Sequence, residues 1–475
     1  MSLSIYNSFT RRKDEFVPID KEQVKLYVCG PTVYGPPHVG HARSYVCFDV
    51  VRRYLDYLGY NVKYVQNITD VGHLVGDSDD GQDKIVAQAA KEKTDPYALA
   101  YKYELKYFEC MDKLGVKRPT ISARATGFIP EMIEMIKSII DSGYGYVTEN
   151  GNVYFSVHKL STYGKLSGRK LENNLSGERI EIADDKQNPE DFALWKSAVG
   201  GHIMKWNSPW GWGYPGWHIE CSTLSKKFLG DTFDIHGGGL DNIFPHHESE
   251  IAQSEVANGK PFVNYFMHNN LVTVNGTKMG KSLGNFITLD DLFKTFDPMV
   301  VRYFILQFHY RKPVDFSYDA IKNIEPQYKK LNDIFSKISL LAGGECAEIL
   351  DENLLATKND FENSMNDDFN TPLATANMLA FSKLASKILE SGDASQAKQA
   401  NTIVKMYSDV LGFDFKSSEK VEQKSNDENE EKTAKLLDLI AKTREKLRSE
   451  KNFALSDYIR DELAKIDIKI NDKKI

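Results

Sequence analysis

The sequence predicts an α/β fold with a parallel sheet in its first part and an α-helical bundle after it. From Lys25 onward, strand-like and helix-like segments alternate, an order typical of βαβ units and parallel sheets. Beyond Phe316 the strand signals fade, and apolar residues recur at helical spacing to about Leu411. With 475 residues the chain exceeds what one hydrophobic core usually supports, so we expect several domains.

The first strand-helix-strand unit begins at Lys25 with the sequence KLYVCGPTVYGPPHVGHAR. A short apolar strand over 26–28 ends at Cys29, and a Gly/Pro loop leads into a helix expected over 42–58. A second strand, expected over 61–66, is followed by Asn-Ile-Thr-Asp. Open α/β sheets bind ligands at the carboxyl ends of their strands, so this tetrapeptide is expected at a ligand site.

The remaining boundaries follow from changes in composition. Gly, Tyr and Val between 143 and 157 indicate short antiparallel strands, which predict an insertion into the α/β domain. Residues between Phe415 and 433 are almost all polar, which is typical of a flexible linker. The expected parts are 1–119, the first half of the core; 120–205, a connective insertion; 206–315, the second half of the core with a lysine-containing loop; 316–415, a helical bundle; 416–433, a flexible linker; and 434–475, a small C-terminal segment.

Charge and cysteine content limit the classes of function. The net charge of -7 and the sequence pI near 5.9 exclude a chain coated in basic surface, although a local Lys/Arg patch can still bind nucleic acid. No apolar run is long enough to span a bilayer, and the N-terminus lacks the apolar core of a signal peptide. The 5 cysteines are scattered without disulfide-like spacing. These features predict a cytoplasmic protein without a membrane partner, whose cysteines are buried thiols, metal ligands or reactive groups.

Two short motifs favour phosphate binding. His38 and His41 lie at the expected start of a helix, where free backbone N–H groups and the helix dipole attract anions. Lys278 and Lys281 lie in a Gly-rich loop, KMGKS, and can neutralise charge on a leaving pyrophosphate. Either pair also fits an ordinary surface position, since both motifs are short.

A glycine-rich run, IHGGGLD at 235–241, follows an expected strand. Its glycines can bring the backbone close to a nucleotide, and Asp241 can accept a hydrogen bond from a ribose hydroxyl. The same run also fits a tight turn.

A further group of residues has the chemistry of a metal site. His246 and Glu250 are four positions apart in PHHESEIAQS and would share one face of a helix. Together with Cys29 at the first strand end and Cys221 in PGWHIECST, they would form a tetrahedral zinc set. The spacing is not a CxxC…CxxC pattern, and each cysteine on its own also fits a buried, inert thiol. Only the pairing with Glu250 favours His246 over His247.

Taken together and in order, these motifs resemble the class I aminoacyl-tRNA synthetases and, within them, the cysteinyl-tRNA synthetase family. The resemblance covers nearly the whole chain, and ordered matches of this length are far more specific than any motif alone. The segments that carry it are CGPTVYGPPHVGHAR (29–43), NITD (67–70), YGKLSGR (163–169), FALWK (192–196), SPWGWGYPGWHIECS (208–222), DIHGGGLDNIFPHHESEIAQS (234–254), KMGKSLGNFITL (278–289) and DDFNTP (367–372).

The resemblance implies a Rossmann-type catalytic core with a connective insertion, then a helical anticodon-binding region and a small tail. The positions that match the family's functional residues are, for catalysis, His38, His41, Lys278 and Lys281; for ATP, also His236, Gly237, Gly238 and Asp241; for the amino acid, Thr69 and Trp217; and for zinc, Cys29, Cys221, His246 and Glu250. Gly280 departs from the serine that the family most often has in its mobile lysine loop.

The implied reaction has two steps: ATP activates L-cysteine to cysteinyl-adenylate, and the cysteinyl group then passes to the 3′ end of tRNA(Cys). Alignment and charge stabilisation by the histidines and lysines would carry the catalysis, with Mg²⁺ accompanying ATP. Zinc would bind the substrate thiolate and reject the alcohol of serine, so no editing domain is expected. We expect a monomer whose helical half and tail contact the tRNA. The basic tail candidates, each of which also fits a solvated helix face, are Lys442, Arg444, Lys446, Arg448 and Arg460.

Two other functions stay open on the residues alone. A related cysteine ligase that transfers cysteine to the amine of a small sugar would share the core but lack the long helical half after Phe316. A zinc-stabilised RNA-binding protein without catalysis would need neither the histidine pair nor the lysine loop. The helical half and these two motifs favour the tRNA ligase.

Overall fold

The computed structural model describes residues 2–74, 81–169, 185–198, 202–279, 285–416 and 418–465. The chain divides into two compact units, Met1–Asp414 and Phe415–Ile475. Among the described residues, no helix combines the length and the apolar content needed to cross a membrane.

The centre of the first unit is a parallel sheet of five strands, which confirms the predicted fold class. Its strands, in spatial order, are β12 (Val263–Asn269), β11 (Phe233–Gly239), β3 (Gln23–Val28), β4 (Asn61–Ile68) and β5 (Ile121–Arg124). Every neighbouring pair is parallel. The carboxyl ends of β3, β4, β11 and β12 therefore lie at one edge of the sheet, where such sheets bind ligands.

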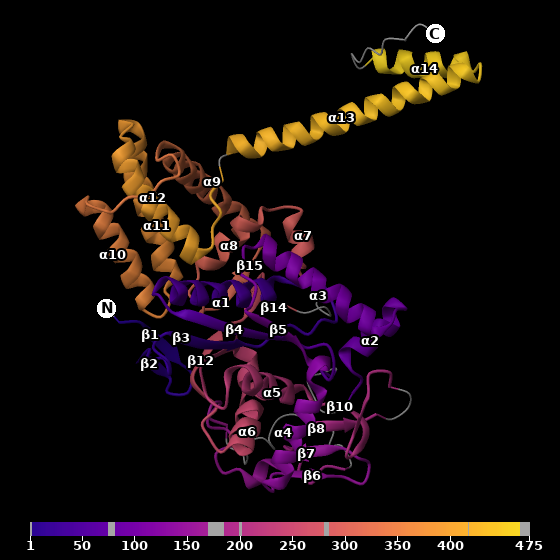
Figure 1. The fold of residues 1–475 in the computed structure, drawn as a ribbon, viewed down its shortest axis with the longest axis vertical. Coiled ribbons are helices and arrows are strands. Elements are labelled where there is room, and N and C mark those ends of the chain that lie inside the picture. Colours follow the sequence, from indigo (N-terminus) through magenta and orange to yellow (C-terminus); the bar gives the residue numbers. More distant parts are fainter. Residues whose placement is uncertain are drawn as a thin grey trace. The chain divides into compact units, whose positions relative to one another are not determined.

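Helices cover both faces of this sheet. Helix α1 (Val39–Tyr57) connects β3 to β4 and lies on one face, whereas α5 (Trp217–Leu229) and α6 (His246–Asn258) pack together on the other (Figure 1). Two further helices, α2 (Lys84–Glu92) and α3 (Pro96–Lys113), lie between β4 and β5 in the chain. The N-terminal ends of α1, α5 and α6 are the ends that bear the predicted site residues.

The insertion has different boundaries from those predicted at 120–205. Residues 121–124 form β5, which extends the parallel core sheet, so the insertion starts after them. A second sheet then runs past 205, because the segment at 211–215 pairs with the strand at 192–197. Composition could not reveal this, since pairing with a distant strand, not local content, assigns a short strand to its sheet. The insertion contains α4 (Ile129–Asp141), β6 (Gly145–Val147), β7 (Val153–Phe155), β8 (Phe192–Ser197), β9 (Trp206–Ser208) and β10 (Gly211–Pro215).

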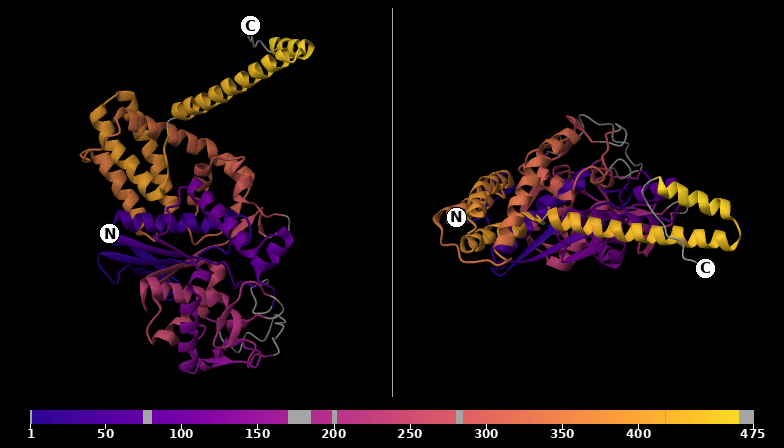
Figure 2. Two further views of the ribbon diagram at one scale, coloured as in Figure 1. Left: turned by 45° about the vertical axis from the view of Figure 1, so that its right-hand side comes forward. Right: turned by 90° about the horizontal axis from the view of Figure 1, so that it is seen from above.

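The second half of the first unit is helical, as predicted. Its bundle lies on the side of the sheet that α1 covers (Figure 2). Short β-segments precede it, and a further pair, β1 (Ser4–Asn7) and β2 (Arg12–Glu15), opens the chain. The remaining elements of this unit are β13 (Val272–Val274), β14 (Thr277–Lys278), α7 (Leu289–Phe293), α8 (Pro298–Leu306), β15 (Val314–Phe316), α9 (Tyr318–Leu341), α10 (Glu352–Asn366), α11 (Thr371–Ser391) and α12 (Ala394–Leu411).

A buried ion pair joins the sheet region to this bundle. Arg302 of α8 donates to the carboxylate of Asp49 on α1 at 2.5 Å, and both side chains are fully buried. The same guanidinium donates to the backbone oxygens of Leu411 at 2.6 Å and Leu114 at 2.9 Å. The helix that begins at His38 is thus fixed to α8 and to the end of α12.

The described residues of the C-terminal unit form α13 (Ser418–Ser449) and α14 (Phe453–Ala464). The linker predicted at 416–433 is wrong from Ser418 onward, where the chain is helical. The segment is polar but rich in Glu, Lys and Gln, which have high helix propensity, and polarity alone does not exclude a helix. Arg444, predicted as a tRNA contact, is buried and donates to the backbone oxygen of Ser456, so it joins the two helices.

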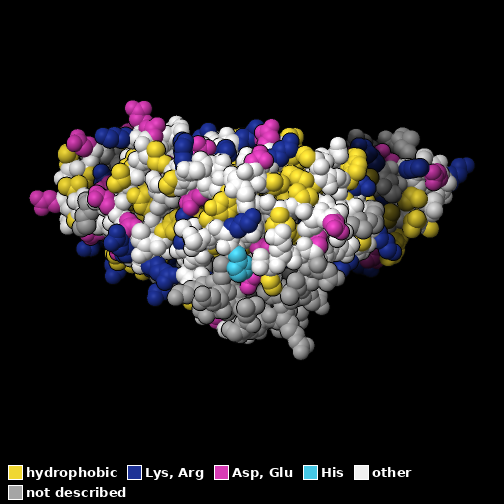
Figure 3. Space-filling model, turned by 90° about the horizontal axis from the view of Figure 1, so that it is seen from below, with side chains coloured by type: hydrophobic (Ala, Val, Ile, Leu, Met, Phe, Trp, Pro, Cys, Tyr) yellow, Lys and Arg dark blue, Asp and Glu magenta, His cyan; other side chains and the backbone are white. Residues whose placement is uncertain are grey.

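The molecular surface carries charges of both signs. On the face shown in Figure 3, Lys and Arg side chains are interspersed with Asp and Glu. This mixture agrees with the net charge of -7 and with the exclusion of a uniformly basic surface.

Candidate active site and metal centre

A cavity of about 370 Å³ opens at the carboxyl edge of the core sheet. It is lined by residues from the ends of β3, β4, β11 and β12 and from the N-terminal ends of α1, α5 and α6. Of the residues predicted from the sequence, those that line it are Cys29, His38, His41, Thr69, Trp217, Gly238, Asp241 and His246.

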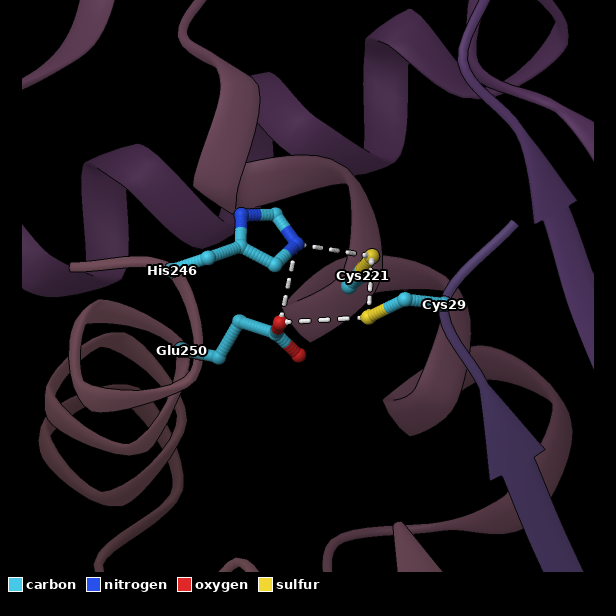
Figure 4. A group of neighbouring side chains, drawn as sticks. All are labelled: Cys29, Cys221, His246 and Glu250. Atoms are coloured by element: carbon cyan, nitrogen blue, oxygen red, sulfur yellow. Dashed lines mark hydrogen bonds and ion pairs between the residues drawn. The ribbon is translucent and has the colours of Figure 1, made fainter. Parts of the chain in front are cut away.

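The four predicted metal ligands come together beside this cavity. Their donor atoms form a closed ring in which each side chain points at the next (Figure 4). The two Sγ atoms lie 3.8 Å apart, Cys221 Sγ lies 3.6 Å from His246 Nε2, and Cys29 Sγ lies 3.7 Å from Glu250 Oε1. His246 Nε2 lies 3.1 Å from the same Oε1 atom and closes the ring.

These distances fit one tetrahedral ion. Zinc bonds of about 2.3 Å to sulfur and about 2.0–2.1 Å to nitrogen place two sulfurs about 3.8 Å apart, and a sulfur and a nitrogen about 3.5 Å apart. The observed separations are 3.8 Å and 3.6 Å. The donor set of two thiols, one imidazole and one carboxylate therefore matches zinc in both geometry and ligand type.

Burial disfavours the charged forms of these four side chains. Desolvation raises the pKa of the Cys29 thiol well above its ordinary value and that of Cys221 to about 11. It also raises the pKa of Glu250 and lowers that of His246. A divalent cation among them would favour the thiolates and the carboxylate, so the cluster is electrostatically suited to a metal ion.

Two histidines outside the ring orient the ligands. The Nδ1 atoms of His218 and His246 lie 2.8 Å apart, a hydrogen bond that leaves His246 Nε2 directed at the ring. His236 Nε2 donates to Glu250 Oε2 at 2.7 Å, so Oε1 faces the other ligands. Such hydrogen bonds fix the orientation of metal-binding side chains.

The position of His236 corrects a prediction. The sequence placed it in the adenosine pocket, but its side chain is fully buried and bonded to Glu250. Gly237 also lies behind the cavity, where a Cβ would come within 2.4 Å of the Phe48 ring. Both residues lie before the carboxyl end of β11, where the sheet is covered, His236 toward α6 and Gly237 toward α1, while Gly238 and Asp241, farther along the chain, line the cavity.

The structure also distinguishes His246 from the adjacent His247 as the candidate metal ligand. His247 Nε2 lies 3.2 Å from Cys29 Sγ, so Cys29, His236, His247 and Glu250 form a second group with metal-binding side chains. In that group His236 and Glu250 already satisfy each other at 2.7 Å, closer than two ligands of one tetrahedral ion. We therefore assign the candidate metal position to the group that contains His246.

The two histidines that the sequence predicts to contact phosphate lie at the N-terminus of α1. His38 is the N-cap residue, and its Nδ1 accepts from the backbone N–H of Gly40 at 3.1 Å. His41 Nδ1 accepts from the backbone N–H of His38 at 3.2 Å, and the two rings stack at 3.9 Å. Burial lowers the pKa of His41 to about 4, so this ring is neutral at pH near 7. Because Nδ1 accepts in each ring, a neutral ring carries its proton on Nε2 and can donate it to an anion.

Thr69, one of the two predicted amino-acid contacts, directly follows β4 and lies in a buried hydrogen-bond network. The Thr69 hydroxyl donates to Glu220 Oε2 at 2.8 Å, and Asn67 Nδ2 donates to Thr69 Oγ1 at 3.0 Å. Asn67 Oδ1 also accepts from the N–H of Gly30, where the backbones approach so closely that a Cβ would overlap Asn67. These bonds hold the ends of β3 and β4 together beneath the cavity.

The predicted lysines are only partly described. The backbone of Lys278 belongs to β14, and Lys281, like Gly280, lies outside the described residues. Neighbouring Met279 and Phe286 line the cavity. The assignment of both lysines to ATP therefore stays a prediction.

Sequence reasoning missed a group of cavity residues beside Trp217. His73 stacks on the Trp217 indole, and Thr32 and Lys84 both hydrogen-bond to the His73 ring. A lone histidine in a polar stretch carries no local signal, so nothing in the sequence around His73 predicts this contact. Its position next to the strand-end sequence NITD is the one feature that pointed to the site.

Comparisons with known proteins place this geometry in a family. The family described as tRNA synthetases class I (C) catalytic domain matches residues 15–326, and the DALR domain family matches residues 360–416. A cysteine--tRNA ligase of Chlorobaculum tepidum is 49% identical over 481 residues, covering 100% of this chain and 98% of the relative. A cysteine--tRNA ligase of Bacteroides fragilis is 44% identical and covers 99% of this chain and 97% of the relative.

A solved structure has the same fold. The chain is similar to a Mycobacterium tuberculosis methionyl-tRNA synthetase in complex with methionyl-adenylate, with a TM-score of 0.60 at 15% identity. The match covers 82% of this chain and 92% of that one. Fold, site and full-length sequence similarity agree: the chain belongs to the cysteine--tRNA ligases, a family of class I aminoacyl-tRNA synthetases.

Proposed function

We propose that this chain activates L-cysteine with ATP and transfers the cysteinyl group to the 3′ end of tRNA(Cys). The observation that carries the proposal is one cavity with two chemically different ends. The thiol-rich donor ring contributes Cys29 and His246 to its lining, and the start of α1 contributes His38 and His41. A substrate that joins a thiol to a phosphate donor fits this arrangement.

The ATP end of the cavity is formed by α1. His38 and His41 would donate from Nε2 to phosphate oxygens, next to the positive end of the helix dipole. Asp241, which lines the cavity, would accept from a ribose hydroxyl, and Gly238 would allow close approach of the nucleotide. We assign Lys278 and Lys281 to the leaving pyrophosphate, and Mg²⁺ would accompany ATP.

The amino-acid end is formed by the donor ring. Cys29, Cys221, His246 and Glu250 would hold one Zn²⁺. Bound there, Zn²⁺ supplies a soft Lewis acid that takes a thiolate in preference to an alcohol, which separates cysteine from serine. Thr69 and Trp217 would form the walls that orient the amino acid.

No side chain needs to act as a nucleophile. A carboxylate oxygen of cysteine bonds to the α-phosphorus of ATP, and the bond from that phosphorus to the pyrophosphate oxygen breaks. The terminal ribose hydroxyl of the tRNA then attacks the carbonyl carbon, and AMP leaves. The residues of the chain contribute alignment and hydrogen bonds to the phosphates.

The helical half would recognise the tRNA. We assign α9–α12, which overlap the DALR match, to the anticodon region, and the exposed basic residues of α13 and α14 to further phosphate contacts. We propose that the protein acts as a monomer in the cytoplasm. Sedimentation of the purified chain would test the monomer.

The two alternative functions are not favoured. The full-length similarity is to cysteine--tRNA ligases, and the helical half that an amino-sugar ligase would not need is present. A pure RNA-binding protein has no use for a cavity that joins a donor ring to a helix N-terminus.

Pyrophosphate exchange tests the proposal directly. With ATP and cysteine, the purified chain should exchange labelled pyrophosphate into ATP, and serine should give at most a trace. Charging of total tRNA with labelled cysteine then tests the second step, and elemental analysis tests for zinc. Absence of cysteine-dependent exchange from zinc-loaded protein would refute the proposal.

A further inference from the structure

Three aromatic rings form a stack along one wall of the cavity. The His73 ring lies 3.9 Å from the Trp217 indole, with an angle of 10° between the planes. The other face of the indole lies 4.2 Å from the His246 ring, at 28°. All three residues line the cavity, and the indole is packed between the two imidazoles.

His73, the outer ring of the stack, forms a hydrogen bond at each of its two ring nitrogens. Lys84 Nζ lies 2.6 Å from His73 Nε2, and Thr32 Oγ1 lies 2.6 Å from His73 Nδ1. A lysine ammonium can only donate, so Nε2 accepts, and Nδ1 carries the proton that it donates to Thr32. The ring therefore has one tautomer and one orientation, fixed by the loop after β3 and by the start of α2.

The inner ring is equally constrained. His246 is bonded through Nδ1 to His218 and faces Cys221 and Glu250 through Nε2. Neither neighbour of the indole can move without breaking a short hydrogen bond. A flat side chain packed between two fixed rings has little freedom to yield to a larger ligand.

The four metal-binding side chains cannot by themselves select the length of the substrate side chain, whereas a rigid cavity wall can. A metal ion held by these four side chains would distinguish sulfur from oxygen, but homocysteine carries the same thiol on one additional methylene group. A yielding pocket distinguishes one methylene by only about 1–3 kcal/mol. Rejection of the longer thiol therefore requires a boundary that limits the distance between the sulfur and the carboxylate.

We propose that His73 is a specificity-determining positioning residue, which holds Trp217 as the wall that excludes homocysteine. His73 acts through the indole and needs no contact with the substrate. This inference rests on the proposed function, because it concerns selection at the same site. It assigns the selection of the thiol and the selection of side-chain length to different residues.

Substitutions at His73 test the inference in the full-length, zinc-loaded protein. In His73→Ala, the ratio of kcat/KM for homocysteine to that for cysteine, measured by pyrophosphate exchange, should rise about tenfold or more. The serine-to-cysteine ratio and the zinc content should stay at wild-type values. In His73→Phe, which retains a stacking ring, the homocysteine ratio should return close to wild type. His158→Ala, an exposed histidine of the insertion, is the matched control and should change neither ratio.

Two results would overturn the inference. One is an unchanged homocysteine ratio in folded His73→Ala, and the other is an equal rise in the homocysteine and serine ratios. If His73→Ala does not fold, the double variant Thr32→Val with Lys84→Met frees the ring, and an unchanged homocysteine ratio in it counts against the inference. Wild-type protein without any cysteine-dependent exchange would refute the proposed function itself, which separates the two failures.

Discussion

The sulfur atoms of Cys29 and Cys221 lie 3.8 Å apart, although 192 positions separate the two residues in the chain. Cys29 directly follows strand β3, and Cys221 lies in the first half of α5. Their proximity therefore depends on how the helix packs on the sheet. Together with His246 and Glu250, they make one position at which a single ion can be bound.

Replacement of one sulfur ligand should separate metal binding from folding. We expect Cys221→Ser to lose zinc and to raise KM for cysteine at least about tenfold, because a hydroxyl is a poor ligand for a soft ion. Zinc per chain and exchange kinetics measure both effects. Cys47→Ser, at a buried thiol outside the ring, is the control and should retain zinc. A zinc-free Cys221→Ser protein with normal KM would refute the assigned role.

The two adjacent histidines should behave differently. We expect His246→Gln to lose zinc, because its Nε2 is one corner of the ring. His247→Gln should retain zinc, since its ring only approaches Cys29 from behind and is bonded to His268 at 2.8 Å. The measurement is the zinc content of the two variants, purified under the same conditions. Loss of zinc in His247→Gln alone would transfer the metal to the second group of side chains.

The buried ion pair between α1 and α8 should be costly to break. Asp49→Asn leaves the Arg302 guanidinium buried without its counter-charge, so we expect a loss of about 3–5 kcal/mol in the free energy of unfolding. The exposed pair between Arg118 and Asp112 is the control, and Asp112→Asn should cost less than about 1 kcal/mol. Urea unfolding measures both. Equal losses in the two variants would contradict the structural role of the buried pair.

Acid should destabilise the chain through its buried histidines. Burial lowers the folded-state pKa of His41 to about 4 and that of His268 to about 3. In the unfolded chain both rings titrate near 6.5. The stability that these neutral rings contribute is therefore complete above about pH 6.5 and is lost as the pH falls toward 4, because only the unfolded chain binds the protons.

The expected slope is up to about 1.4 kcal/mol per pH unit for each ring. Unfolding measured between about pH 7 and 5 should show it, and His41→Gln should reduce the slope by one ring's share. His158→Gln, at an exposed ring, should leave the slope unchanged. A wild-type stability independent of pH in this range would contradict the neutral, buried state of His41.

Much of the site could be predicted from the sequence because its residues lie at strand ends and helix starts. Cys29 follows an apolar strand, and His38 and His41 begin a helix, so local pattern was enough to place them. The spacing of His246 and Glu250 predicted a shared helix face, and α6 contains that pair. The grouping of the four candidate ligands, however, depended on their donor chemistry and on the resemblance, because no local pattern relates β3 to α5.

Other features depend on interactions that the sequence does not display. The role of His236 depends on which way alternate residues of β11 face, and its buried bond to Glu250 replaced the predicted nucleotide contact. The short strand β5 joins the core sheet only through pairing with β4. His73 gave no signal, since its stacking on Trp217 requires two loops that meet only in the folded chain.

The ligands of the donor ring become neighbours only after the sheet and its covering helices have assembled. An unfolded chain offers four separate, weak donors instead. An ion captured by the finished arrangement therefore adds to the free energy of unfolding with the logarithm of its free concentration. The side chains that would select the substrate would thus also couple the stability of the folded protein to the free concentration of the metal ion that they bind.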